Sequence, residues 1–124
     1  MAESYLGRFK KRQYMDGGFS PEAFECDDDE TGLCCHIRKP PLHTDEGVSA
    51  YQNAFPFPSG DKLGVCVLRP SCFSGMQKPK RKLPDNRDEP FAELHCELSP
   101  CPNDDQAAQL AKCARKLRDF EKHK

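Results

Sequence analysis

The chain has 124 residues, a formal net charge of −1 and a mean hydropathy of −0.82. A chain of this length forms one domain, and none of its apolar stretches is long enough to cross a bilayer. The near-neutral charge argues against a typical nucleic-acid-binding protein. Because the chain lacks tryptophan and contains 11 prolines, we expect a modest hydrophobic core that its 8 cysteines supplement with disulfides.

Residues 1–25 contain no cysteine and combine aromatic side chains with a short basic run. Two interpretations remain open. The first is an N-terminal arm that precedes a disulfide-linked domain over residues 26–124. On such an arm Tyr14 and Phe19 are candidate partner contacts, because aromatic side chains often dominate protein interfaces. The second, slightly favoured, is an N-terminal strand that closes over a small core.

An acidic run at residues 27–30 lacks the ligand spacing of a calcium-binding loop and is predicted to be a solvated turn. The next segment, Leu33–Ile37, is apolar and predicts a short strand. His36 and His43 follow the pair Cys34-Cys35, and this is the arrangement in the chain most similar to a metal site. Its spacing matches no zinc template, so we predict no metal and no cofactor.

Residues 44–62 show no clear periodicity and are predicted to be irregular. Within them, Phe55 and Phe57 alternate with prolines, which favour an extended backbone at the residue before them. These rings form either a recognition loop or a lid over the core. The β-branched segment Gly64–Leu68 predicts a strand, and Arg69 directly after it is a further candidate partner contact.

Residues 77–90 are polar and interrupted by prolines, which predicts a linker or a long exposed loop. The basic residues between Lys78 and Lys82 resemble a short nuclear-import signal or a patch for polyanions. Such runs also arise on exposed loops with no binding role, so the signal is weak.

The C-terminal quarter gives the clearest local signals. Residues 91–98 alternate apolar and polar side chains, as a half-buried strand does. Asn103 is a suitable N-cap residue for a following helix. Apolar residues at spacings of three and four then predict a helix at about residues 104–121, with Cys113 on its inward face.

The functional interpretation depends mainly on the number and spacing of the cysteines. The number of cysteines is even, and they include no C-x2-C pair, the spacing typical of zinc sites. We therefore predict that all of them form disulfides, which indicates an oxidising, extracellular setting. The first residues show no secretory signal, which argues against secretion unless the chain is a mature domain with an added start methionine. The cysteines are Cys26, Cys34, Cys35, Cys66, Cys72, Cys96, Cys101 and Cys113.

These features predict a small disulfide-rich α+β fold with short antiparallel strands, one C-terminal helix and long irregular loops. The predicted function is that of a secreted, cysteine-rich module that binds a target protein, as an inhibitor, a toxin-like protein or a host-modulating protein. Enzymatic activity is not expected, because the chain lacks the G-x-S-x-G, H-E-x-x-H and phosphate-loop motifs. We expect neither a small-molecule substrate nor a nucleic-acid partner. The candidate partner contacts are Tyr14, Phe19, Phe55, Phe57 and Arg69.

Two alternatives remain open at this stage. One is an intracellular, nuclear or cytoplasmic protein with reduced thiols, which enters the nucleus through residues 78–82 and binds zinc. The other is a structural subunit of a large assembly, whose proline-rich segments become ordered against neighbouring chains. The zinc ligands in the first alternative would come from Cys34, Cys35, His36, Cys96 and Cys101.

Overall fold

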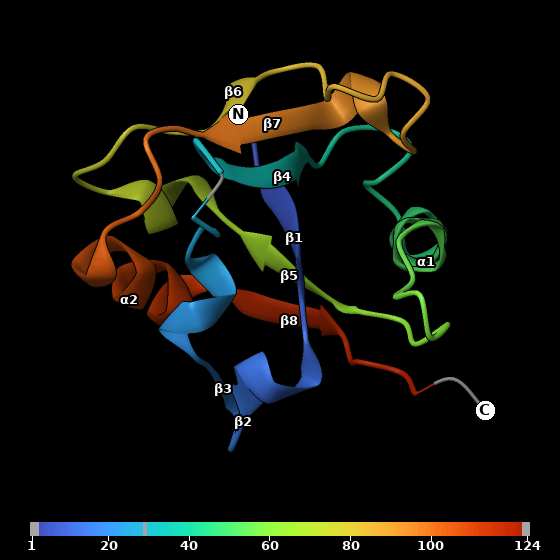
Figure 1. The fold of residues 1–124 in the computed structure, drawn as a ribbon, viewed down its shortest axis with the longest axis horizontal. Helices are drawn as coiled ribbons and strands as arrows, with labels where there is room; N and C mark the ends of the chain where they lie inside the picture. The colour runs from blue at the N-terminus through green and yellow to red at the C-terminus, as the bar shows by residue number, and fades with distance from the viewer. Residues whose placement is uncertain (1–2, 29, 123–124) are drawn as a thin grey trace.

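The computed structural model describes residues 3–28 and 30–122, and this part of the chain forms a small α+β domain. Figure 1 shows a six-stranded antiparallel sheet with the strand order β6-β7-β4-β1-β5-β8. The short strands β2 and β3 form a separate hairpin. The strands are β1 (Tyr5–Phe9), β2 (Tyr14–Met15), β3 (Gly18–Phe19), β4 (Leu33–Ile37), β5 (Gly64–Leu68), β6 (Lys80–Arg81), β7 (His95–Leu98) and β8 (Arg115–Arg118). The helices are α1 (Asp45–Ala54), α2 (Asp104–Cys113) and the 3-10 turns η1 (Lys11–Gln13), η2 (Pro21–Phe24), η3 (Pro70–Phe73) and η4 (Ala92–Leu94).

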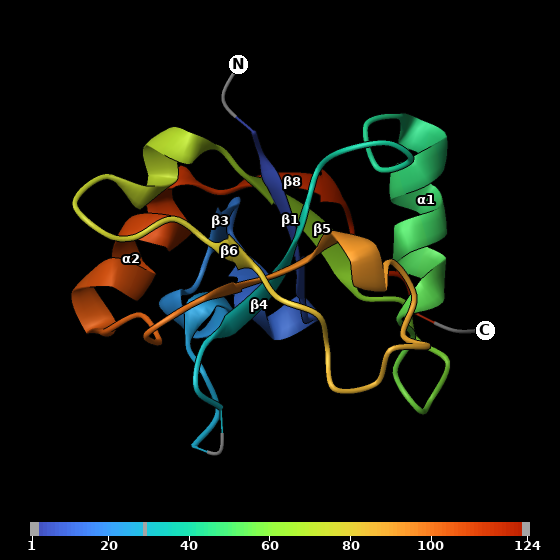
Figure 2. The same cartoon turned by 90° about the horizontal axis from the view of Figure 1, so that it is seen from above.

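The sheet separates two hydrophobic layers, because successive residues of a strand point to opposite faces. On one face, Tyr5 of β1 belongs to a buried cluster that includes Leu110 of α2. On the other face, Leu6 joins a second cluster with Tyr51 of α1. Figures 1 and 2 accordingly show the two α-helices on opposite sides of the sheet.

The segment predicted to be irregular contains α1, so the expectation of a single C-terminal helix is wrong. Thr44 caps this helix by accepting a hydrogen bond from the Gly47 amide at 3.1 Å, and two acidic residues occupy the first turn, where the helix dipole favours them. The buried positions of α1 include only Val48 and Tyr51 as large apolar residues. Two large apolar residues are too few to show the repeated spacing of three and four by which a helix is recognised in a sequence.

The N-terminal segment lies inside the sheet. β1 pairs with β4 on one side, where Tyr5 lies opposite Ile37, and with β5 on the other, where Tyr5 lies opposite Leu68. Residues 5–9 therefore form a strand, as the second interpretation of the N-terminal segment expects. This strand, β1, belongs to the same sheet as the strands that follow residue 26.

The C-terminal helix is shorter than predicted. Its start is as expected, because Asn103 and Gln106 form a reciprocal capping box. α2 ends at Cys113, however, and the next residues form β8, which pairs with β5. Leu117 lies on this strand and contacts the second hydrophobic cluster. Pairing with β5 therefore replaces the helix that the apolar spacing predicted.

The remaining strand predictions agree with the structure in part. β4 and β5 have the residues expected of them. In the alternating segment 91–98 only His95–Leu98 is a strand, and the preceding Ala92–Leu94 is a 3-10 turn. Phe91, with a φ of 57°, begins that turn.

Candidate functional site

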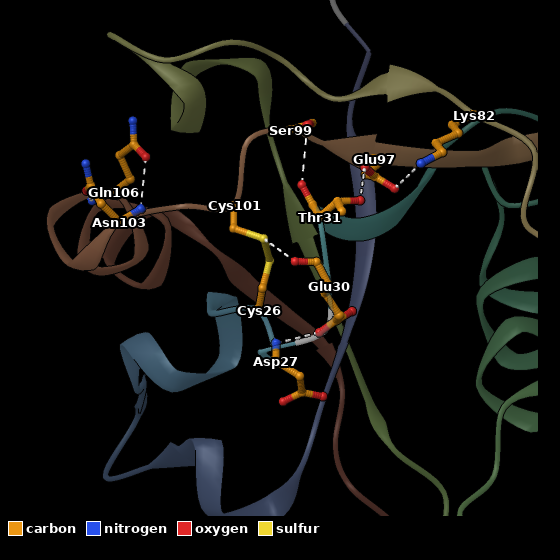
Figure 3. The surroundings of a disulfide bond; sticks show 10 residues. All are labelled: Cys26, Asp27, Glu30, Thr31, Lys82, Glu97, Ser99, Cys101, Asn103 and Gln106. Carbon is orange, nitrogen blue, oxygen red and sulfur yellow. Dashed lines mark hydrogen bonds and ion pairs between the residues drawn. A yellow bond between two sulfur atoms is a disulfide. The ribbon is translucent and has the colours of Figure 1, made fainter.

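A disulfide between Cys26 and Cys101 joins the segment before β4 to the segment after β7. Figure 3 shows the polar contacts that extend from this bridge along the two strands. The Ser99 hydroxyl donates to the Thr31 carbonyl at 3.4 Å, and the Thr31 hydroxyl donates to Glu97 Oε1 at 3.5 Å. The bridge and these contacts hold the acidic turn against the end of the sheet.

A second disulfide, between Cys72 and Cys113, joins η3 to the last residue of α2. The Gln109 side chain strengthens this junction by donating to the carbonyls of Cys72 and Ser74 at 3.0 and 2.8 Å. Because β8 begins two residues after Cys113, this bridge also fixes where the last strand starts.

The structure pairs four of the eight cysteines that we expected to be bridged, and the other four carry free thiols. Cys35 and Cys96 are buried opposite one another on β4 and β7. Cys66 is buried on β5, and Cys34 is exposed. Cys34 is adjacent to Cys35 on β4 and therefore faces the side of the sheet opposite to the cluster that contains the other three free thiols, so it has none of them as a partner. Burial raises the pKa of Cys66 to about 12 and raises that of Cys35 well above its ordinary value.

A cleft of about 460 Å³ opens beside β4 and β7. Three strands supply reactive or hydrogen-bonding groups to it, namely Arg8 from β1, Cys34 from β4 and His95 from β7. Lys82 and Glu97 at its edge form an ion pair at 3.0 Å. The other charged lining residues are Glu30, Asp85 and Glu89.

Behind this cleft lies a buried polar network. The Tyr51 hydroxyl lies 2.8 Å from His36 Nδ1. Nε2 is buried and has no hydrogen-bond partner within residues 3–28 and 30–122. Burial, helped by the positive charge of Arg8, lowers the pKa of His36 to about 3, and burial raises the pKa of Tyr51.

A groove of about 510 Å³ lies at the other end of the molecule, beside the chain that follows β8. Phe9, Tyr14 and Phe120 supply its rings, and Lys11 and Lys122 supply positive charge. We call this site the aromatic groove; its remaining lining residues are Asp61 and Asp119.

The predicted partner contacts do not form one surface. Tyr14 lines the aromatic groove, and Phe57 adjoins it through its ring contact with Phe120 at 6.4 Å. Phe19 packs edge-on against Tyr14, with ring centroids 4.6 Å apart. The other two residues lie elsewhere: the Phe55 ring lies 4.0 Å from the Arg8 guanidinium, and Arg69 is exposed before η3.

The sequence interpretation missed Phe120, Arg8 and His95 as site residues. Phe120 falls within the helix predicted at about residues 104–121, whereas the chain has left α2 before reaching it. The alternation of residues 91–98 did place His95 on the polar face of a strand. That face borders a cleft and is largely buried, which a local pattern does not indicate.

No group of three or more His, Cys, Asp or Glu side chains suitable for a metal ion occurs among the residues that the structure describes. The zinc site of the intracellular alternative is therefore not assembled there. Cys101 is in a disulfide, and Cys35 and Cys96 face the α2 side of the sheet.

The chain was compared with protein-family models, with curated proteins and with solved structures. No family model, no curated protein and no solved structure matches the chain. Among the described residues, no helix is long and apolar enough to cross a membrane.

Proposed function

We propose that this protein is a secreted, disulfide-linked module that binds a partner protein. The bound element is an acidic, extended segment that lies along β8 and continues into the aromatic groove. The observation that carries the proposal is that a basic edge strand and a groove with aromatic and cationic side chains adjoin one another.

The edge strand provides the backbone part of the binding surface. β8 is the last strand in the sheet order, so one of its sides has no partner strand among the described residues. An unpaired edge presents free amide and carbonyl groups to which an extended peptide can add as a further strand. Arg115 and Lys116 on this edge are exposed.

The aromatic groove provides the side-chain part of that surface. Tyr14 and Phe120 are half-buried, so they retain apolar surface that a partner can cover. Lys11 and Lys122 are exposed at the same groove. The Asp119 carboxylate is already paired with Lys116 at 2.6 Å, which reduces its repulsion of an acidic ligand.

The charges favour an acidic partner over a second copy of this chain. The two edge strands of the sheet, β6 and β8, carry Lys80-Arg81 and Arg115-Lys116. Pairing of either edge with itself or with the other would bring like charges together, which destabilises a strand pair. An acidic strand would instead place carboxylates beside both cations of β8, with Lys116 shared between the ligand and Asp119.

The two disulfides support a binding role outside the cell. Disulfides persist mainly in oxidising compartments, and a surface held rigid before binding loses less conformational entropy on association. The Cys72–Cys113 bridge supplies this rigidity directly beside β8. Occupation of a target's acidic segment gives the protein an inhibitory or host-modulating action, without a catalytic step.

The test is a fluorescence anisotropy titration with a labelled peptide that alternates glutamate and valine. Reversing two edge charges, with Arg115→Glu and Lys116→Glu, is expected to weaken binding about tenfold, because both attractive contacts become repulsive. The matched control reverses the same types of charge on the opposite edge, with Lys80→Glu and Arg81→Glu, and is expected to leave binding within about twofold.

Three outcomes would contradict the proposal. An equal loss in the two variants would show general electrostatic attraction without a site on β8. Tighter binding of a single-stranded oligonucleotide than of the peptide would indicate a polyanion-binding protein. Absence of binding to the parent protein would mean that the edge charges only protect the sheet from association.

A further inference from the structure

Cys34 is separated from every other free thiol by the sheet itself. Cys35 and Cys96 are opposite one another in register, and both lie in the hydrophobic cluster on the α2 side. Cys66 belongs to the same cluster, and its sulfur lies 3.2 Å from the position that a Cβ on Gly7 would occupy. Cys34 points to the opposite face, because it is adjacent to Cys35 on β4. It therefore has no partner for an internal disulfide.

The thiol of Cys34 lines the cleft beside β4 and β7 together with His95 and Arg8. In the strand register Cys34 lies opposite Glu97, and His36 lies opposite His95. Cys34 and His95 are thus diagonal neighbours on one face of the sheet, at a spacing that an aromatic ring such as the His95 imidazole can span.

His95 has an unused hydrogen-bonding atom at this cleft. Its side chain is only 6% exposed, and Nδ1 lies 2.6 Å from the Lys82 carbonyl oxygen. A carbonyl oxygen only accepts, so Nδ1 carries the hydrogen and Nε2 carries the lone pair of the neutral ring. No partner for Nε2 occurs in the described part of the chain, which leaves it to accept a proton or a hydrogen bond in the cleft.

The charges around Cys34 favour a positive ligand. Four carboxylates line the cleft against two cations, and Lys82 is already paired with Glu97. Burial, followed by the charges of Glu97 and Glu30, raises the pKa of the Cys34 thiol, and Arg8 opposes this only in part. The potential at the sulfur is therefore negative. The lining carboxylates are Glu30, Asp85, Glu89 and Glu97.

We propose that Cys34 is a thiol–disulfide exchange site that accepts small disulfides bearing a positive charge. His95 Nε2 takes the thiol proton, and the Cys34 sulfur attacks one sulfur of the ligand disulfide. The ligand S–S bond breaks, a new S–S bond joins Cys34 to half of the ligand, and the other half leaves as a thiol that regains the proton. The incoming disulfide is the oxidant, so no further reagent is needed.

The experiment compares three disulfides at equal concentration with the folded protein, without reductant. The probes are cystamine, which is cationic, bis(2-hydroxyethyl) disulfide, which is neutral, and oxidised glutathione, which is anionic. Intact-mass spectrometry over time gives the rate at which one adduct forms. We expect cystamine to react at least about threefold faster than the neutral probe, and the difference to shrink at about 1 M salt, where charges are screened within about 3 Å.

Three variants test which residues carry out the exchange reaction. Cys34→Ser is expected to abolish the adduct while retaining peptide binding at β8, so this test is independent of the proposed function. Glu89→Gln is expected to reduce the preference for cystamine over the neutral probe. His95→Gln retains a side chain that can donate to the Lys82 carbonyl, and it is expected to slow all three probes alike.

The proposal is overturned if the Cys34→Ser variant still gains the adduct, since a different thiol would then be reacting. It is also overturned if oxidised glutathione reacts faster than cystamine, or if a disulfide-linked dimer forms in place of the adduct. Equal rates for parent and His95→Gln would remove His95 from the proton transfer.

Discussion

Gly47 in α1 permits an unusually close approach between this helix and the loop before it. A Cβ built on Gly47 overlaps the Pro41 carbonyl oxygen, and it lies 2.7 Å from the Pro41 carbonyl carbon and 3.1 Å from the Leu42 Cα. These are backbone atoms, which cannot rotate away as the end of a side chain does. The substitution Gly47→Ala therefore forces the first turn of α1 away from the loop.

The expected cost can be estimated from two opposing effects. Alanine is favoured over glycine within a helix by about 1 kcal/mol. Overpacking typically costs about 1–3 kcal/mol, and the upper part of that range applies because the displaced turn holds Val48 and leads into Tyr51, which are 2% and 0% exposed. We expect Gly47→Ala to lower the free energy of unfolding by about 2 kcal/mol.

Urea unfolding followed by circular dichroism measures this change. The control is Asn53→Ala at an exposed position of the same helix, where better helix propensity should raise the free energy of unfolding by a few tenths of a kcal/mol, roughly 0.5. If Gly47→Ala were as stable as the parent or more stable, the close approach of α1 to Pro41 would be refuted.

Two further predictions concern the disulfides and the buried histidine. Replacing Cys72 and Cys113 together by alanine opens a loop with a sequence separation of 41 and should lower the free energy of unfolding by about 4 kcal/mol; thermal unfolding without reductant checks this, and an unchanged transition contradicts it. His36 has a folded pKa of about 3 against 6.5 in the unfolded chain, so below about pH 6 the unfolded chain takes up a proton that the folded protein excludes, and stability falls by about 1.4 kcal/mol per pH unit. Urea titrations at pH 7 and at about pH 5 should show a smaller fall for His36→Gln than for the parent, and an identical fall in both proteins would count against the buried neutral imidazole.

The parts of the fold that were predicted correctly depend on neighbours in sequence. Asn103 caps α2 through Gln106, three residues away. The short strand β5 is apolar because it is buried throughout, and β4 is buried over its last three residues. In these cases the local residues are sufficient to select the structure.

The parts that were missed depend on contacts between distant residues. In α1 the buried Gln52 side chain donates to the carbonyls of Leu63 and Asp119 at 2.9 and 2.8 Å. A polar residue thus occupies a core position, which disrupts the apolar pattern of the helix. β8 is a strand because β5 offers it a partner, although its own sequence also suits a helix.

The same distinction applies to the candidate sites. Tyr14 and Phe57 were selected for their aromatic side chains, and both lie at or beside the aromatic groove. Arg8 and His95 could not be connected from the sequence, because only the strand order brings β1, β4 and β7 together. The orientation of Cys34 away from the other free thiols likewise follows from the sheet and not from the spacing of the cysteines.

The two disulfides are interleaved along the chain, since Cys72 lies between Cys26 and Cys101, and Cys113 lies beyond both. Any single peptide bond between residues 26 and 113 consequently falls inside at least one covalent ring. A protease that cuts once in the polar segment 77–90, which both rings enclose, leaves the two fragments covalently attached to each other. A single cut in this largely exposed segment therefore releases no fragment, which is a useful property wherever hydrolytic enzymes are abundant.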